Sequence, residues 1–289
     1  MSSAIYDLGY QRYQGVKYGR AGAIRTLIAF SFRAAFGIGR GEQARRIPIL
    51  VALFVALPAL GQIAVASATG QVAFINYANL LLLNGFAIAL FVAAQAPELI
   101  VTDKNNGALT LYLSRPIKAT DYAWAKLVAL WAATVMLTLV PQLVLFTARV
   151  FLPESPWAAF KDEWTKLFPI LGGSLLASLF FAAVALALSS FAVKRAFGSA
   201  SVIAFFLLSP ALSSIAQMVS TGDIKRWSVM LNPVTVVSGY SKWLFDLEAS
   251  RRSTVARADL PGQAYMWVIL AVSAIAISLL LSRYRKNEE

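Results

Sequence analysis

The sequence has no cysteine and no histidine among its 289 residues. Disulfide bonds, thiol nucleophiles and imidazole bases are therefore excluded, and so are metal sites that use either side chain. Charged residues are also scarce, at 14% of the chain, whereas a soluble domain carries about a quarter. Hydrophobic residues reach 58%. These proportions indicate that lipid, not water, surrounds much of the protein.

Six apolar segments are long enough to cross a bilayer. An α-helix rises about 1.5 Å per residue, so roughly 20 apolar residues cross the hydrocarbon core. We therefore predict an all-α integral membrane protein with six transmembrane helices, which form one transmembrane domain over residues 47–289. The predicted spans are 47–67, 76–96, 121–148, 167–192, 199–220 and 263–282.

The basic residues predict how these spans are oriented. Of the 26 lysines and arginines, sixteen lie in the N-terminal segment, in the loops after the second and fourth spans, and in the C-terminal tail. Nine lie in the three opposite loops, where acidic residues and greater length dilute them. Because cytoplasmic loops are enriched in Lys and Arg, both termini are predicted to be cytoplasmic. The net charge of +12 then fits anionic lipid better than nucleic acid.

The N-terminal segment, residues 1–46, precedes the first span. Within 20–40, apolar residues recur at helical spacing, while three arginines gather on another face. This pattern predicts an amphipathic elbow helix that lies in the membrane interface. The glycines at positions 37, 39 and 41 follow it and predict a turn into the first span.

Residues 221–262 form a long, partly apolar stretch between the fifth and sixth spans. A seventh span here would place the basic C-terminal tail outside, against the charge pattern. Asn232 followed by Pro233 is typical of a helix N-cap and first turn. We therefore predict short external helices that touch the membrane, with no further crossing.

The loop between the second and third spans, residues 97–120, is bracketed by prolines. It contains acidic residues, a glycine turn and a leucine-rich run that is too short to span. A short apolar cluster at the water surface needs a cover, which is either a partner subunit or the protein's own helix ends. The candidate coupling residues are Glu98, Asp103, Gly107, Leu109, Leu111, Tyr112, Leu113, Arg115 and Pro116.

This order of features resembles the ABC-2 type permeases, the membrane-spanning subunits of bacterial ABC exporters. Segment 98–116 carries most of the resemblance, and segments 6–15 and 232–239 are similar to one subgroup of that family. The resemblance implies a cytoplasmic coupling helix near 108–114 and two ATPase subunits docked beneath it. It also implies a second permease, identical or related, and a place in the bacterial plasma (inner) membrane.

The chain has no Gly-x-x-x-x-Gly-Lys-Ser/Thr loop to cradle phosphates. ATP and Mg²⁺ are therefore expected in a partner subunit, with no cofactor and no metal bound here. We interpret the chain as a non-catalytic permease for an amphipathic cargo such as a drug, peptide antibiotic, lipid or glycan. A membrane scaffold that moves nothing is the alternative. An intramembrane enzyme is disfavoured because the sequence offers no catalytic constellation.

Amides inside the predicted spans are the candidates for a translocation path. They are Asn84, Gln142 and Gln217, of which Asn84 and Gln142 lie deep enough that they should face other helices or a cavity. Packing between helices is the commoner role for such residues. No span carries a pair of ionisable residues near its centre, which disfavours an ion-coupled carrier.

Overall fold

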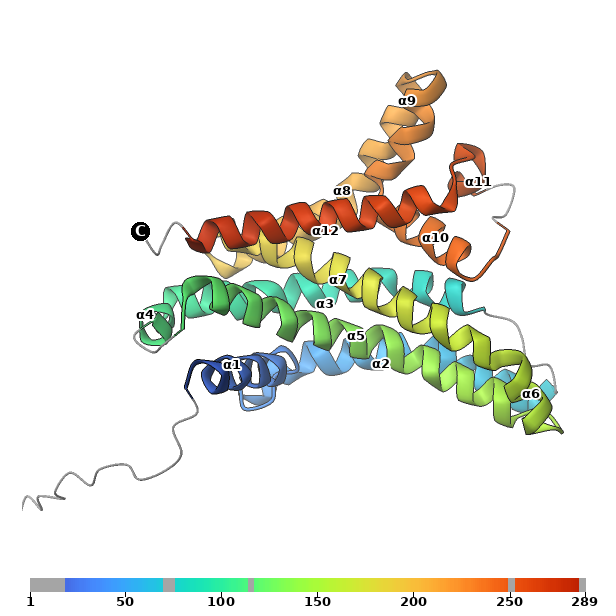
Figure 1. The fold of residues 1–289 in the computed structure, drawn as a ribbon, viewed down its shortest axis with the longest axis horizontal. Helices are drawn as coiled ribbons and strands as arrows, with labels where there is room; N and C mark the ends of the chain where they lie inside the picture. The colour runs from blue at the N-terminus through green and yellow to red at the C-terminus, as the bar shows by residue number, and fades with distance from the viewer. Residues whose placement is uncertain (1–18, 70–75, 114–116, 249–252, 286–289) are drawn as a thin grey trace, which may run out of the picture.

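The computed structural model describes residues 19–69, 76–113, 117–248 and 253–285, and the side chains of Leu109, Thr110 and Leu113 lie outside this description. Every regular element in the described residues is a helix. Long helices lie side by side in a bundle, and shorter helices lie at both of its ends (Figure 1).

Six described helices are long and apolar enough to cross a membrane, which confirms the predicted fold class and a multi-pass membrane protein. Each of them overlaps one predicted span. They are α2 (Glu42–Thr69), α3 (Tyr77–Asn105), α5 (Ala119–Phe151), α7 (Leu167–Phe191), α8 (Arg195–Val219) and α12 (Gly262–Arg285).

The shorter helices divide between the two ends of the bundle (Figure 1). The end called here the α4 end holds α1 (Gly19–Ala35), α4 (Ala108–Leu113) and the last turn of α12. The opposite end, called the α6 end, holds the remaining short α-helices. These are α6 (Pro156–Glu163), α9 (Gly222–Trp227), α10 (Pro233–Leu244) and α11 (Thr254–Ala258), with 3-10 turns η1 (Trp164–Lys166) and η2 (Ser228–Leu231) between them.

The helices differ widely in burial. α3 and α7 are the most enclosed, whereas only about a quarter of the apolar windows of α2, α8 and α12 is buried within the chain. Where α5 meets α7, small and polar side chains replace large apolar ones. Gln142 Nε2 donates to Ser174 Oγ at 3.0 Å, and the hydroxyls of Thr138 and Ser178 share a hydrogen bond of 2.9 Å. Such contacts hold helices together where lipid removes the hydrophobic driving force.

Pro97 marks a difference from the sequence prediction, which placed the end of the second span there. α3 continues through this proline to Asn105. A proline inside a helix frees a backbone carbonyl, and a neighbouring helix can accommodate the altered backbone. α8 approaches closely here, since a Cβ atom on Gly198 would lie 2.9 Å from Pro97 Cβ. The first part of the predicted loop is therefore helical.

The turn between α1 and α2 contains the glycines that predicted it. Gly37 and Gly39 have φ angles of +70° and +86°, which residues other than glycine rarely adopt. A Cβ atom on Gly37 would also lie 2.6 Å from the carbonyl oxygen of Ala44. Glycine is thus required for the turn at Gly37 to pack against the first turns of α2.

α10 begins as the sequence predicts and packs back onto the bundle. Asn232 caps it by accepting from the N–H of Val234 at 2.9 Å. Tyr240 donates its hydroxyl to the carbonyl oxygen of Gly172 in α7 at 3.1 Å. Burial raises the pKa of Tyr240 to about 12, so the phenol keeps the proton that it donates. Gly239 lies against Tyr265 of α12, where a Cβ atom would come within 2.5 Å of the ring.

We expect Gly239→Ala to destabilise the protein, because the added methyl group overpacks the contact between α10 and α12. Overpacking of this kind costs about 1–3 kcal/mol. The measurement is thermal unfolding of the purified protein in detergent. Gly61→Ala is the matched control, because a Cβ atom there meets nothing within 4 Å. Equal melting temperatures for the two variants would show that the α10–α12 contact is not tight.

Candidate functional site

α4 lies at the tip of the hairpin made by α3 and α5. α3 ends at Asn105, and the following turn uses Gly107 at a φ of +67°, where glycine is favoured. On α4 itself, Leu111 is 69% exposed, whereas the ring of Tyr112 lies 5.8 Å from that of Tyr122 on α5. The short helix therefore has one apolar side chain at the surface and one turned toward the bundle. Arg115, Pro116 and the side chains of Leu109 and Leu113 lie outside the described residues.

A buried ion pair joins the two helices of this hairpin close to α4. Lys126 Nζ of α5 lies 2.7 Å from Asp103 Oδ2 of α3, and the lysine is only 1% exposed. The hydroxyl of Tyr122 also donates to Asp103, at 3.0 Å. A buried charge is tolerated only when a partner and hydrogen bonds compensate it. Asp103, predicted as a coupling residue, therefore fixes the end of α3 against the start of α5.

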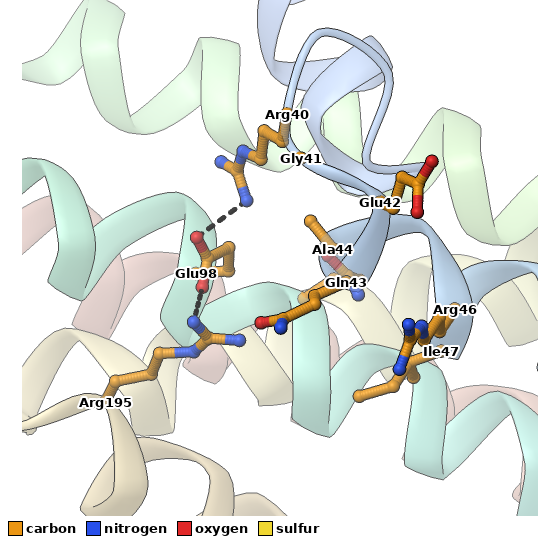
Figure 2. A pocket seen from close by; sticks show the side chains of 10 residues that line it. Arg40, Gly41, Glu42, Gln43, Ala44, Arg46, Ile47, Glu98 and Arg195 are labelled. Atoms are coloured by element: carbon orange, nitrogen blue, oxygen red, sulfur yellow. Dashed lines mark ion pairs between the residues drawn. The ribbon is translucent and has the colours of Figure 1, made fainter.

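Glu98 joins three segments that are far apart in the sequence. Its carboxylate lies 2.7 Å from Arg40 in the turn before α2 and 2.5 Å from Arg195, the first residue of α8 (Figure 2). The glutamate side chain is 12% exposed, so water screens these pairs only in part. Through Glu98, α3 holds the starts of both α2 and α8.

A third carboxylate, Asp121, anchors α1. Arg20 donates from two nitrogens to the two oxygens of Asp121, each at 2.8 Å, and the N–H of Lys118 donates to the same carboxylate at 3.0 Å. The arginine side chain is 52% exposed, so this pair orients α1 more than it stabilises the fold. Glu98 and Asp121 thus attach the α3–α5 hairpin to α1 and to the starts of α2 and α8, whereas Asp103 joins its two helices to each other.

An open cleft of about 810 Å³ lies beside the Glu98 cluster. The start of α2 forms one wall, and Figure 2 shows Arg40 and Arg195 reaching Glu98 from different elements. The complete lining is Arg40, Gly41, Glu42, Gln43, Ala44, Arg46, Ile47, Gln95, Glu98 and Arg195.

The structure does not bring the three path candidates together. Asn84 is buried and donates from Nδ2 to the carbonyl of Val55 at 3.1 Å, between α3 and α2. Gln142 bonds between α5 and α7, as described above. Gln217 donates to the carbonyl of Ser213 within α8. Each amide therefore serves a separate contact, and a role in translocation stays a prediction. No group of Asp and Glu suited to hold a metal ion occurs in the described part of the chain.

Sequence reasoning missed the basic partners of the three carboxylates. Arg20, Arg40 and Arg195 were read only as orientation signals, and their pairing depends on the tertiary fold. Lys126 had a usable signal, because it is the one basic residue inside a predicted span. An ionisable residue in such a place points to a buried partner and a functional role.

Comparison with known proteins gives one informative similarity. The chain is similar to the probable ABC transporter permease protein NosY of Pseudomonas aeruginosa, with 27% identity over 237 residues. The aligned region covers 77% of this chain and 85% of that protein. No protein-family model matches the chain.

We expect Lys126→Met to destabilise the protein strongly, since it leaves the Asp103 carboxylate without its cation. Breaking a buried pair by removing one partner costs about 3–5 kcal/mol. The double variant Asp103→Asn with Lys126→Met should recover much of this loss, because neither charge remains. The free energy of unfolding in detergent is measured for the single and the double variant. Additive losses in the double variant would show that the two residues do not interact.

Proposed function

We propose that this chain is the permease subunit of an ATP-driven, ABC-2 type exporter in the bacterial plasma membrane. The observation that carries the proposal is α4, a short helix with Leu111 exposed at its surface, on a hairpin that ion pairs fix to the bundle. The similarity to a protein named as a probable ABC transporter permease supports it, as do the six helices of membrane-spanning length.

In this proposal, α4 docks into a groove of an ATPase subunit that binds ATP and Mg²⁺. Movement of the ATPase then shifts α4, and the shift passes to the ends of α3 and α5 because Asp103 and Lys126 hold them together. Glu98 carries the same movement to the starts of α2 and α8 through its two arginines. The chain transmits motion and performs no covalent chemistry.

α2 and α8 are suited to face a second permease across a shared path, since both leave most of their apolar surface uncovered within the chain. Leu57 and Leu60 are more than half exposed on α2, as are Leu207, Leu208 and Leu212 on α8. Two such permeases, each with one ATPase, would enclose a path for an amphipathic cargo. Exposed apolar surface of this kind needs lipid or protein to cover it.

Leu111→Asp should abolish docking of the ATPase, because a carboxylate at the apolar contact must be desolvated without a partner. The test is co-purification with the partner ATPase subunit, followed by measurement of ATP hydrolysis. We expect at least about a tenfold loss of association, in line with the loss of one central apolar contact.

Ile224→Asp is the matched control. Ile224 is 71% exposed on the short helix α9 at the α6 end, so the same chemical change falls on the side away from the proposed ATPase. If Leu111→Asp binds and stimulates the ATPase as well as Ile224→Asp does, α4 is not the docking element. A membrane scaffold would then become the better interpretation.

The proposal requires the α4 end to face the cytoplasm. The natural absence of cysteine makes this directly measurable, since a single introduced thiol has no background. Ile224→Cys should react with a membrane-impermeant maleimide in spheroplasts, whereas Leu111→Cys should react only after permeabilisation. The reverse pattern would place the candidate coupling helix on the outside and refute the proposed docking.

A further inference from the structure

The cleft beside Glu98 has a basic lining. Three arginines, Arg40, Arg46 and Arg195, face two acidic residues, Glu42 and Glu98. Arg40 and Arg195 each contact Glu98 through a single terminal nitrogen. A guanidinium group has five N–H donors, so both arginines keep donors for another oxygen-bearing group.

Arg46 supplies a further cation. It is exposed, lines the cleft, and makes no ion pair with any residue in the described ranges. Figure 2 shows it on the start of α2, beyond Gln43 from the Glu98 cluster. An arginine in this position offers its charge to whatever enters the cleft.

The wall opposite Arg195 is the N-terminus of a long helix. Residues 41–44 line the cleft and lie at the first turn of α2, a helix of 28 residues. The first N–H groups of a helix lack intrahelical acceptors, and the helix dipole places partial positive charge there. This turn therefore favours an anion, and phosphate above all.

Gln95 gives independent evidence for a ligand. Its side chain belongs to the cleft lining and is 6% exposed, yet it has no hydrogen-bond partner in the described part of the chain. Its amide is open to the cleft, so the hydrogen bonds that the protein does not supply come from whatever occupies the cleft. A ligand oxygen in the cleft would accept from this amide.

The surroundings of the cleft select among phosphate-bearing molecules. Its lining ends at Ile47, from which the exposed apolar side chains Leu50, Leu53 and Phe54 continue along α2. Because α2 is a helix of membrane-spanning length, this surface meets acyl chains. A phosphate in the cleft and hydrocarbon along α2 together describe an anionic phospholipid.

We propose that the cleft formed by the start of α2, by α3 and by the first residue of α8 is a binding site for the phosphate group of an anionic phospholipid. Arg40, Arg46 and Arg195 supply the charge, the first turn of α2 supplies N–H groups, and Gln95 donates from its amide. Binding at this site requires no ATPase, so its test does not depend on the proposed transport function.

The experiment uses the purified full-length chain in a neutral maltoside detergent. Native mass spectrometry follows its titration with dioleoyl phosphatidylglycerol, with dioleoyl phosphatidylcholine as the neutral comparison. We expect preferential binding of phosphatidylglycerol. Arg46→Gln and Arg195→Gln should each weaken it about fivefold, the effect of one basic residue at an anionic lipid surface.

Two further variants separate a built site from general attraction. Gln95→Leu leaves the net charge unchanged and should still weaken binding severalfold. Arg33→Gln removes one charge from an exposed position on α1, outside the cleft lining, and should have little effect. Melting temperatures of all four variants check that the fold is retained.

Three outcomes decide the matter. Weaker binding of phosphatidylglycerol in the cleft variants, but not in Arg33→Gln, supports the proposal. If Arg33→Gln weakens phosphatidylglycerol binding as much as the cleft variants do, the proposal is overturned, because charge alone then explains the binding. The proposal is also overturned if the chain shows no preference for phosphatidylglycerol over phosphatidylcholine and millimolar inorganic phosphate displaces the bound lipid. The cleft would then be a site for free phosphate.

Discussion

The buried pairing of Asp103 with Lys126 is the contact on which the α4 end depends. Without it, the last turns of α3 and the first turns of α5 would each hold an uncompensated charge beside apolar side chains. The pair also sets where α4 lies, because the short helix is connected on both sides to the residues that it fixes. The pair therefore fixes α3 and α5 relative to each other, as the proposed coupling to an ATPase subunit requires.

Two kinds of contact hold the helices together, one in the middle of the bundle and the other at its ends. In the middle, hydroxyl and amide hydrogen bonds such as Gln142 to Ser174 hold helices that lipid cannot drive together. At the ends, where water approaches, carboxylate side chains make the polar contacts between helices. The α6 end has its own example, in which Glu163 accepts from the Tyr77 hydroxyl at 2.8 Å and lies 3.6 Å from Arg149. Ion pairs at the ends thus add to the hydrogen bonds that hold the helices in the middle.

The fold was predictable because length and hydropathy determine a membrane-spanning helix almost alone. Local signals were equally reliable at Asn232, which caps a helix, and at Gly37, which makes a turn. The site was less predictable. Glu98 could be singled out from its position after the second span, but its partners Arg40 and Arg195 are distant in sequence and meet it only through packing. Pro97 likewise packs closely against Gly198, a residue of another helix that is distant in sequence.

Glu98 belongs both to the hairpin and to the basic cleft, and this links the two. Its arginines hold the starts of α2 and α8, two of the three long helices that are least covered within the described part of the chain. A phosphate in the cleft would share the same guanidinium groups, so occupancy and the attachment of α2 and α8 to α3 are thermodynamically coupled. Any motion of the hairpin that displaces Glu98 would then alter affinity in the cleft, and a bound anion would in turn favour one position of the hairpin. Arg46, which lines the cleft without contacting Glu98, supplies charge that does not depend on that exchange.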